Sequence, residues 1–317
     1  MRAARPRDIG RAISLIENGS PDLSRLARAL ARDTGRAHVV GLTGSPGVGK
    51  STTTSAMVGA LRAAGDRVAV LAVDPSSPFS GGALLGDRVR MQSHALDSGV
   101  YIRSMATRGH LGGLSAAAPQ ALRVFDAAGF HTVLVETVGV GQSEIEVAAT
   151  ADTTVVLLAP GMGDSIQAAK AGILEIGDIF VVNKSDRDGS QALIRELRGM
   201  IALGEREPDA WKPPIVATVA VAGQGIAELM ETIERFRASQ QASGQAVVRR
   251  IARARREVES LALGRLRAQL SLEGRAGLDE LAGAVSRGEL DPYVAADQLL
   301  AGLDPDAPGA PGGRSAG

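Results

Sequence analysis

Residues 38–52 read HVVGLTGSPGVGKST, and this stretch decides the fold. The apolar, β-branched run at 38–43 is typical of a buried strand, and a helical pattern follows from Thr52 to Ala64. Between them, residues 44–51 match the motif G-x-x-x-x-G-K-[ST] in full. Glycines in such a loop let successive backbone N–H groups curl around phosphate oxygens at a helix N-terminus. The stretch therefore predicts a phosphate-binding loop in an α/β fold.

Two side chains of this loop carry the expected chemistry. Lys50 can reach the β- and γ-phosphates of a nucleotide, and the Ser51 hydroxyl can ligate Mg²⁺. A chance glycine-rich turn is the alternative, but the strand before the motif and the helix after it argue against one. The residues expected to contact the nucleotide here are Gly44, Ser45, Pro46, Gly47, Val48, Gly49, Lys50, Ser51 and Thr52.

Further apolar runs alternate with helical stretches along the chain. This alternation is typical of a parallel sheet whose faces are both covered by helices. The runs expected to form strands are residues 38–43, 67–73, 131–136, 153–159, 179–182 and 215–219. The sequence thus predicts a doubly wound, mostly parallel α/β domain with helical extensions at both ends.

The extensions set the expected domain organisation. We predict an N-terminal helical extension at 1–36, the phosphate-loop domain at 37–240, a C-terminal helical dimerisation segment at 241–303 and a disordered tail at 304–317. In the dimerisation segment, apolar residues recur in alternating steps of four and three, which makes a seam that can pack on another helix. The seam residues are Val247, Ile251, Ala254, Val258 and Leu261.

Three acidic residues are candidates for a metal site, because carboxylates at strand ends beside a phosphate loop can hold Mg²⁺. Glu136 ends an apolar strand and is followed three residues later by Gly139, in the pattern of a nucleotide-sensing switch whose glycine N–H meets the γ-phosphate. Asp74 ends the second predicted strand, and Asp87 lies in the glycine-rich stretch after it. Any one of these acids, taken alone, also fits a cap or turn. The expected metal ligands are Ser51, Asp74, Asp87 and Glu136.

The tetrapeptide NKSD at residues 183–186 follows the strand predicted at 179–182, where a nucleotide base lies in this type of fold. Asp186 can accept hydrogen bonds from guanine, Asn183 can bind the base or tie down the phosphate loop, and the Lys184 stem can cover the ring. Adenine would leave these polar groups unpaired, at a cost of about 1–3 kcal/mol for each buried group. The pattern predicts a guanine nucleotide, GTP or GDP.

The expected reaction is GTP hydrolysis, slow without a partner. In small GTPases a glutamine directly after the switch glycine orients the attacking water, but Val140 stands there. Gln142 can serve only after a rearrangement, and Arg108, in a glycine-flanked segment, can supply positive charge to the phosphoryl group or be an ordinary loop charge. We therefore expect a partner to accelerate the reaction. The candidate catalytic residues are Lys50, Glu136, Arg108 and Gln142.

Together these motifs resemble those of the cobalamin-associated P-loop GTPases of the MeaB/ArgK type, which are chaperones of methylmalonyl-CoA mutase. The segments that carry the resemblance are residues 41–52, 73–77, 81–91, 104–109, 136–144 and 183–186. The resemblance implies that Lys50, Ser51, Asp74, Asp87 and Glu136 fall on phosphate and metal positions, and Asn183, Lys184 and Asp186 on guanine positions.

The same resemblance implies partners and a role. It implies a homodimer built through the C-terminal helices and Mg²⁺-dependent GTP hydrolysis. The implied partner is an adenosylcobalamin-dependent acyl-CoA mutase, with methylmalonyl-CoA mutase as the default. GTP binding and hydrolysis would gate cofactor loading or protect the mutase from inactivation. The sequence leaves open which mutase is served.

Composition narrows the function classes further. Lys and Arg number 35 against 35 Asp and Glu, so the chain is not a polybasic nucleic-acid coat. It has no cysteine, which excludes thiolate metal sites and suits a reducing cytoplasm. No apolar run reaches the roughly 18 residues that a membrane helix needs. We expect a cytoplasmic protein without nucleic-acid or membrane partners.

Two alternatives remain at this stage. A nickel-insertion GTPase shares the phosphate loop but needs metal ligands, and the only histidines are scattered: His38, His94, His110 and His131. A GTP-regulated RNA- or membrane-binding module would use an arginine-rich stretch, which a helix spreads around its surface and mixes with acids, as on a solvated or dimer-flanking face. Those arginines are Arg249, Arg250, Arg253, Arg255, Arg256, Arg265 and Arg267.

Overall fold

The computed structural model describes residues 5–74, 94, 96–106, 117–137, 149–161, 175–204, 210–273 and 275–301. The chain divides into two compact units, Met1–Arg253 and Ala254–Gly317. The division falls inside one long helix, α11 (Gln245–Glu273). None of the helices in these described ranges is long and apolar enough to cross a membrane.

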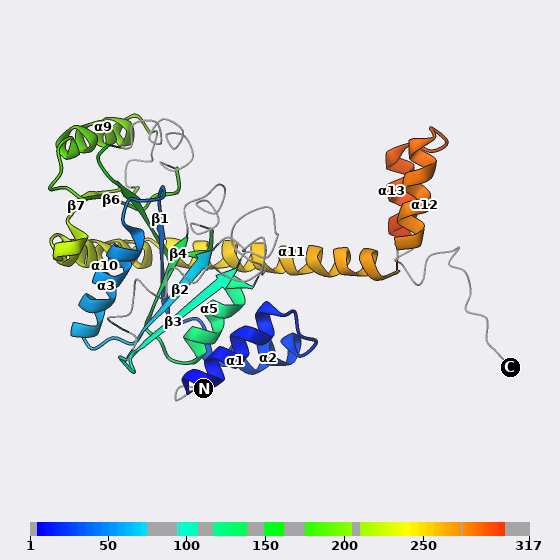
Figure 1. Ribbon diagram of the computed structural model, residues 1–317, viewed down its shortest axis with the longest axis horizontal. Coiled ribbons are helices and arrows are strands. Elements are labelled where there is room, and N and C mark those ends of the chain that lie inside the picture. Colours follow the sequence, from blue (N-terminus) through cyan, green and yellow to red (C-terminus); the bar gives the residue numbers. More distant parts are fainter. Residues whose placement is uncertain are drawn as a thin grey trace. The chain divides into compact units, whose positions relative to one another are not determined.

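A seven-stranded sheet forms the centre of the first unit (Figure 1). Its strands are β1 (His38–Thr43), β2 (Val68–Asp74), β3 (Val100–Ala106), β4 (Thr132–Thr137), β5 (Thr153–Leu158), β6 (Ile179–Asn183) and β7 (Ile215–Thr218). Their order in space is β3-β2-β4-β1-β5-β6-β7, and every pair is parallel. Strands β2, β3 and β4 lie on one side of β1, and β5, β6 and β7 lie on the other. The loop after β1 therefore lies at the switch point where such sheets bind ligands.

All six predicted strands form, and each end lies within one residue of its expected position. The seventh strand, β3, was not predicted. Its sequence VYIRSMA carries Arg103 in the middle, which interrupts the apolar run that identifies the other strands. Arg103 is tolerated there because it lies on the edge strand and donates hydrogen bonds to Ser14 and Glu17 of a covering helix.

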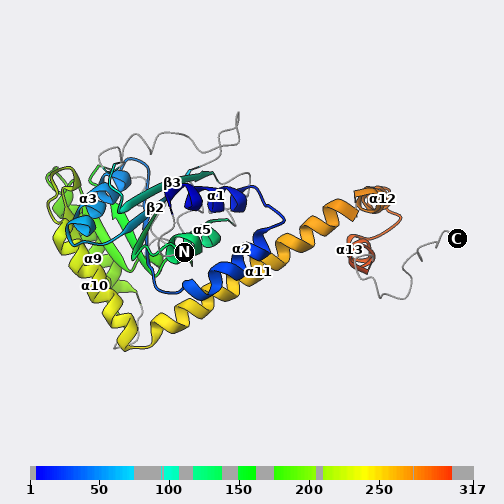
Figure 2. The same ribbon diagram turned by 90° about the horizontal axis from the view of Figure 1, so that it is seen from below.

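Helices cover both faces of the sheet. They are α1 (Pro6–Glu17), α2 (Leu23–Leu30), η1 (Ala31–Asp33), α3 (Lys50–Ala63), α5 (Ala118–Ala127), α9 (Ser190–Leu203), η3 (Ala220–Ala222) and α10 (Ile226–Ala242). Residues of α1 and α5 share one buried cluster with the sheet, and residues of α3 and α10 share another. Figure 2 shows α1 and α5 beside β2 and β3.

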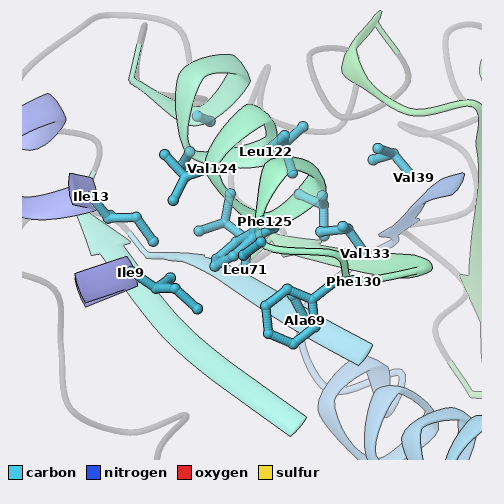
Figure 3. Close-up of a cluster of buried hydrophobic side chains, with 14 of the residues drawn as sticks. Ile9, Ile13, Val39, Ala69, Leu71, Leu122, Val124, Phe125, Phe130 and Val133 are labelled. Carbon is cyan, nitrogen blue, oxygen red and sulfur yellow. The ribbon is translucent and has the colours of Figure 1, made fainter. Parts of the chain in front are cut away.

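The cluster under α1 and α5 is where the predicted N-terminal helices become part of the domain. Ile9 and Ile13 of α1 are buried against the same cluster as Leu71 of β2 and Phe125 of α5 (Figure 3). Their spacing of four places both side chains on one helix face. Burying a side chain of this size contributes about 1.5–3 kcal/mol, so α1 is held mainly by these contacts.

The second unit, Ala254–Gly317, contains the rest of α11 together with α12 (Arg275–Ser286) and α13 (Pro292–Ala301). Helices α12 and α13 pack against each other. Asp291 begins α13 as an N-cap, because its carboxylate accepts hydrogen bonds from the backbone N–H groups of Tyr293 and Val294 at 2.9 and 3.1 Å.

Candidate nucleotide-binding site

The phosphate loop, residues 44–51, joins β1 to α3. Its fold depends on glycine at both ends. Gly49 has φ +98°, and a Cβ there would stand 2.3 Å from the Asn183 side chain. At Gly44, with φ +138°, a Cβ would stand 2.2 Å from the carbonyl oxygen of Leu157 on β5. The motif glycines therefore let the loop pack directly on β5 and on Asn183.

Lys50 is the first residue of α3, and its side chain is buried. Its Nζ donates hydrogen bonds to the carbonyl oxygens of Gly44 and Ser45, at 2.6 and 3.1 Å. These contacts hold the ammonium group over the loop, beside the N-terminus of the helix. A cation and a helix N-terminus at one place make a site that can hold an anion such as phosphate.

Ser51 and Glu136 meet at the same place from different elements. The Ser51 hydroxyl of α3 donates to Glu136 Oε1 of β4 at 2.5 Å, and both side chains are buried. In the sheet, Glu136 is paired in register with Leu42 of β1 and Ala72 of β2, so it lies beside the strand that leads into the loop. The sequence prediction placed these two residues together, and the structure does so.

The donor set at Ser51 and Glu136 fits Mg²⁺. Both offer hard oxygen ligands, and Mg²⁺ in nucleotide sites takes one or two protein oxygens while phosphates and water complete its shell. Asp74 ends β2 at the same edge of the sheet, but the described residues do not include its side chain or any part of Asp87. Within the described ranges, no group of three or more His, Cys, Asp or Glu residues could hold a metal ion, so nothing there favours a nickel site.

Asn183 ties the base region to the phosphate loop. Its Nδ2 donates to the carbonyl oxygen of Val48 at 2.8 Å. Its Oδ1 accepts from the Thr218 hydroxyl and from the Ala220 N–H, each at 3.1 Å. Of the two roles left open for Asn183 by the sequence, the geometry shows the second. The side chain is buried and holds three segments of the chain together.

Lys184 and Asp186 lie on the open side of this junction. Lys184 adopts φ +57°, a left-handed conformation that is uncommon for a residue with a side chain, and its Nζ donates to the carbonyl oxygen of Gly47 at 2.7 Å. Its stem therefore extends toward the phosphate loop. Asp186 is exposed two residues further on. This arrangement can place a flat ring between a lysine stem and the loop, with a carboxylate at its edge.

Sequence reasoning missed Thr218 and Ala220. Thr218 ends β7 and Ala220 begins η3, at the carboxyl edge of the strand next to β6. Residues after neighbouring parallel strands meet at one edge of the sheet, and that rule could have singled them out.

The remaining predicted residues divide into two groups. Thr52 is described and is exposed on α3. Arg108, Gly139 and Gln142 lie outside the described residues, as Asp87 does. The structure therefore brings together Lys50, Ser51, Glu136, Asn183 and Lys184 around one loop.

Comparison with known proteins decides the family. A family model described as methylmalonyl-CoA mutase-associated GTPase MeaB matches residues 9–274. The chain belongs to the MeaB family. The match to the MeaB model includes the phosphate loop, Glu136 and the NKSD segment, so the whole site described above lies inside the family region.

Relatives and a solved structure agree with the MeaB assignment. A putative GTPase from Pyrococcus horikoshii is 44% identical over 300 residues, which cover 93% of each chain. The mitochondrial methylmalonic aciduria type A homolog of Mus musculus is 41% identical over 214 residues, covering 67% of this chain and 52% of that protein. A crystal structure described as LAO/AO transport system kinase has a TM-score of 0.70 at 28% identity and covers 94% of this chain and 93% of its own. The chain is thus a MeaB-family GTPase with the expected fold.

Two residues of the arginine-rich stretch have roles inside this MeaB-family fold. Arg249 donates to Asp178 at 3.1 and 2.9 Å, and Arg253 forms an ion pair with Asp152. The expectation of a solvated or dimer-flanking face is therefore wrong for these two. Because both are bound to acids of the domain itself, they do not favour an RNA- or membrane-binding surface.

Proposed function

We propose that this MeaB-family protein hydrolyses GTP with Mg²⁺ and acts as a chaperone of an adenosylcobalamin-dependent acyl-CoA mutase. In this role it gates cofactor loading and protects the mutase from inactivation. The observation that carries the GTPase part is the meeting of Lys50, Ser51 and Glu136 at one loop that Asn183 ties to the base region. The family description and the Mus musculus relative, which is described as a methylmalonic aciduria type A homolog, support the mutase part.

The proposed roles follow from where each side chain lies. Lys50 balances phosphate charge and holds the loop closed. Ser51 and Glu136 offer oxygen ligands to Mg²⁺, which when bound neutralises charge on the β- and γ-phosphates. We further propose that Asp74 and Asp87 complete the metal surroundings, that Gly139 meets the γ-phosphate, and that Asp186 selects guanine.

We propose that hydrolysis is slow until a partner binds. Val140 stands where a water-orienting glutamine is found in small GTPases, so the chain lacks that group at the usual place. Arg108 and Gln142 are the residues proposed to supply it after a rearrangement. The partner that drives this change is the acyl-CoA mutase, and the acting form is a homodimer.

The test is GTP hydrolysis by the purified protein with Mg²⁺, measured alone and with a purified adenosylcobalamin-dependent methylmalonyl-CoA mutase. We expect slow turnover alone, a several-fold rise with the mutase, and no comparable turnover of ATP. Lys50→Ala should abolish turnover, whereas Lys212→Ala, which removes a lysine just before β7, should leave it unchanged. Guanine-specific turnover that ignores the mutase would keep the GTPase and reject the chaperone role.

A further inference from the structure

Two aspartates stand at the N-terminal edge of the sheet, directly before β5 and β6. Asp152 accepts a hydrogen bond from the Val39 N–H of the neighbouring strand at 2.9 Å. Asp178 accepts one from the Thr154 N–H at 2.8 Å. Each carboxylate therefore joins its own strand to the next one, at the edge opposite the phosphate loop.

Two arginines of α11 bind these same aspartates. Arg249 makes a two-pronged contact with Asp178, at 2.9 and 3.1 Å. Arg253 pairs with Asp152 and also donates to the carbonyl oxygen of Thr150 at 3.1 Å. The arginines are four residues apart and so lie on one face of the helix. We name Arg249, Arg253, Asp152 and Asp178 the α11 clamp.

Pairing with Arg249 compensates a charge that is largely buried. The Asp178 side chain is only 9% exposed, so the guanidinium of Arg249 rather than water compensates its negative charge. Burial raises the pKa of the Asp178 carboxyl above its usual range, while hydrogen bonds from Arg249 act in the opposite direction. If Arg249 leaves, Asp178 becomes an unpaired buried charge or takes up a proton. Separating Arg249 from Asp178 therefore has a free-energy cost.

The two clamped strands also contact the nucleotide loops at their other ends. On β5, the carbonyl oxygen of Leu157 packs against Gly44, where no Cβ would fit. On β6, the last residue is Asn183, which donates to the carbonyl oxygen of Val48. Both strands are buried along nearly their whole length, and a closely packed interior transmits strain. A shift of the phosphate loop thus acts on the strands whose opposite ends hold α11.

We propose that the α11 clamp responds to the bound nucleotide: exchange of GDP for GTP at the phosphate loop shifts β5 and β6 and changes the hold of Arg249 and Arg253 on α11. This rests on the proposed GTPase function and adds its mode of regulation. The clamp would pass the phosphate state to the helix that carries the predicted dimer seam.

The chain contains a reporter for this clamp. Trp211 is its only tryptophan, and the indole N–H donates to the carbonyl oxygen of Asp178 at 2.8 Å. The Trp211 ring lies 5.1 Å from Phe236 between centroids, and the Arg249 guanidinium lies 5.2 Å from the centroid of the same Phe236 ring. Tryptophan emission therefore reports on the place where α11 is held.

The experiment compares tryptophan emission of the full-length protein bound to GDP and to a non-hydrolysable GTP analogue, each with Mg²⁺. We expect two different spectra for the wild type. The variant Arg249→Gln with Arg253→Gln should abolish the difference. The matched variant Arg250→Gln with Arg255→Gln removes the same charge from exposed positions of the same helix and should keep it.

Separate measurements distinguish the possible failures. Calorimetry establishes whether each nucleotide binds, and if neither binds the wild type, the proposed function fails. If both bind but give identical emission, or if the clamp variant keeps the difference, the clamp proposal is overturned. Circular dichroism checks folding. If the double variant does not fold, Arg253→Gln alone takes its place; it leaves the Trp211 surroundings intact and should reduce the difference between the two spectra.

Discussion

Among single residues, two glycines of the phosphate loop allow the cost of backbone strain to be distinguished from the cost of steric overlap. Gly47 and Gly49 both have positive φ, at +81° and +98°. A Cβ at Gly47 meets nothing within 4 Å, whereas one at Gly49 meets the Asn183 amide at 2.3 Å. Alanine at either position pays a left-handed penalty of about 1–2 kcal/mol.

We expect Gly49→Ala to cost about 1–3 kcal/mol more than Gly47→Ala, because it also disrupts the hydrogen bond from Asn183 to Val48. Urea unfolding without nucleotide measures the difference directly. Equal losses in the two variants would show that Asn183 yields without cost.

His38 makes stability depend on pH. It is buried in β1 with its Nε2 2.9 Å from the Thr153 hydroxyl, and burial lowers the pKa of the imidazole below its usual 6.5. The unfolded chain therefore binds a proton at a higher pH than the folded chain does. As pH falls below 6.5, the folded state loses up to about 1.4 kcal/mol per pH unit from this residue, until His38 itself is protonated.

The check is unfolding at about pH 7.5 and about pH 5.5, a window in which unperturbed histidines titrate. His38→Gln should lose less stability between the two than the wild type. His131→Gln, at an exposed position, should behave like the wild type. A wild-type loss that His38→Gln reproduces in full would assign the pH dependence to other groups.

At this scale the sequence predicts what is local and misses what is tertiary. Lys50 and Ser51 lie inside one contiguous motif, and Asn183 begins another, so spacing alone finds them. Thr218 bonds Asn183 across 35 residues, and Arg249 bonds Asp178 across 71. Thr218 can be found only through the rule that the ends of neighbouring parallel strands meet at one edge of the sheet. Nothing in the sequence around Arg249 signals Asp178, because only the folded sheet brings these two together.

Among elements, β3 shows how a charge hides a strand. Arg103 on β3 pairs with Glu17 of α1, and their side chains are only 20% and 12% exposed. The strands of the sheet interior carry uninterrupted apolar runs and were predicted, but this edge strand depends on a helix 86 residues away in the sequence. The periodicity of β3 alone does not contain that information.

The same pair predicts an asymmetric mutational response. Glu17→Gln should cost about 2–3 kcal/mol, because it leaves the Arg103 charge poorly paired in a largely buried place. Glu17→Leu combined with Arg103→Met should recover part of that loss, since neither partner then carries an unpaired charge. Urea unfolding measures both.

The exposed pair at the start of α1 provides the contrast. Arg5 and Asp8 have side chains 81% and 46% exposed, and Asp8→Asn should have little effect on the free energy of unfolding.

For the buried pair, one outcome would contradict the expectation. If the double variant at Glu17 and Arg103 were no more stable than Glu17→Gln, packing rather than charge would explain the loss.

At the scale of the whole molecule, α11 has two faces with different tasks. Arg249 and Arg253 bind the sheet through one face. The seam residues Val247, Ile251 and Val258 lie on another, and they are 62%, 64% and 66% exposed. An apolar stripe of this kind, with steps of four and three, is the pattern by which helices pair. The clamp thus leaves the seam open for the proposed homodimer.

We expect a dimer in solution, with about twice the 32.6 kDa of one chain, and light scattering measures the mass. Ile251→Asp with Val258→Asp should give the mass of one chain, because two carboxylates on each helix would face each other across an apolar seam. Ser260→Asp adds an acid to the same helix off the seam and should leave the dimer intact. If the seam variant keeps the dimer mass, the copies pair through another surface and the seam serves a different partner; if the wild type has the mass of one chain, the homodimer is rejected at the outset.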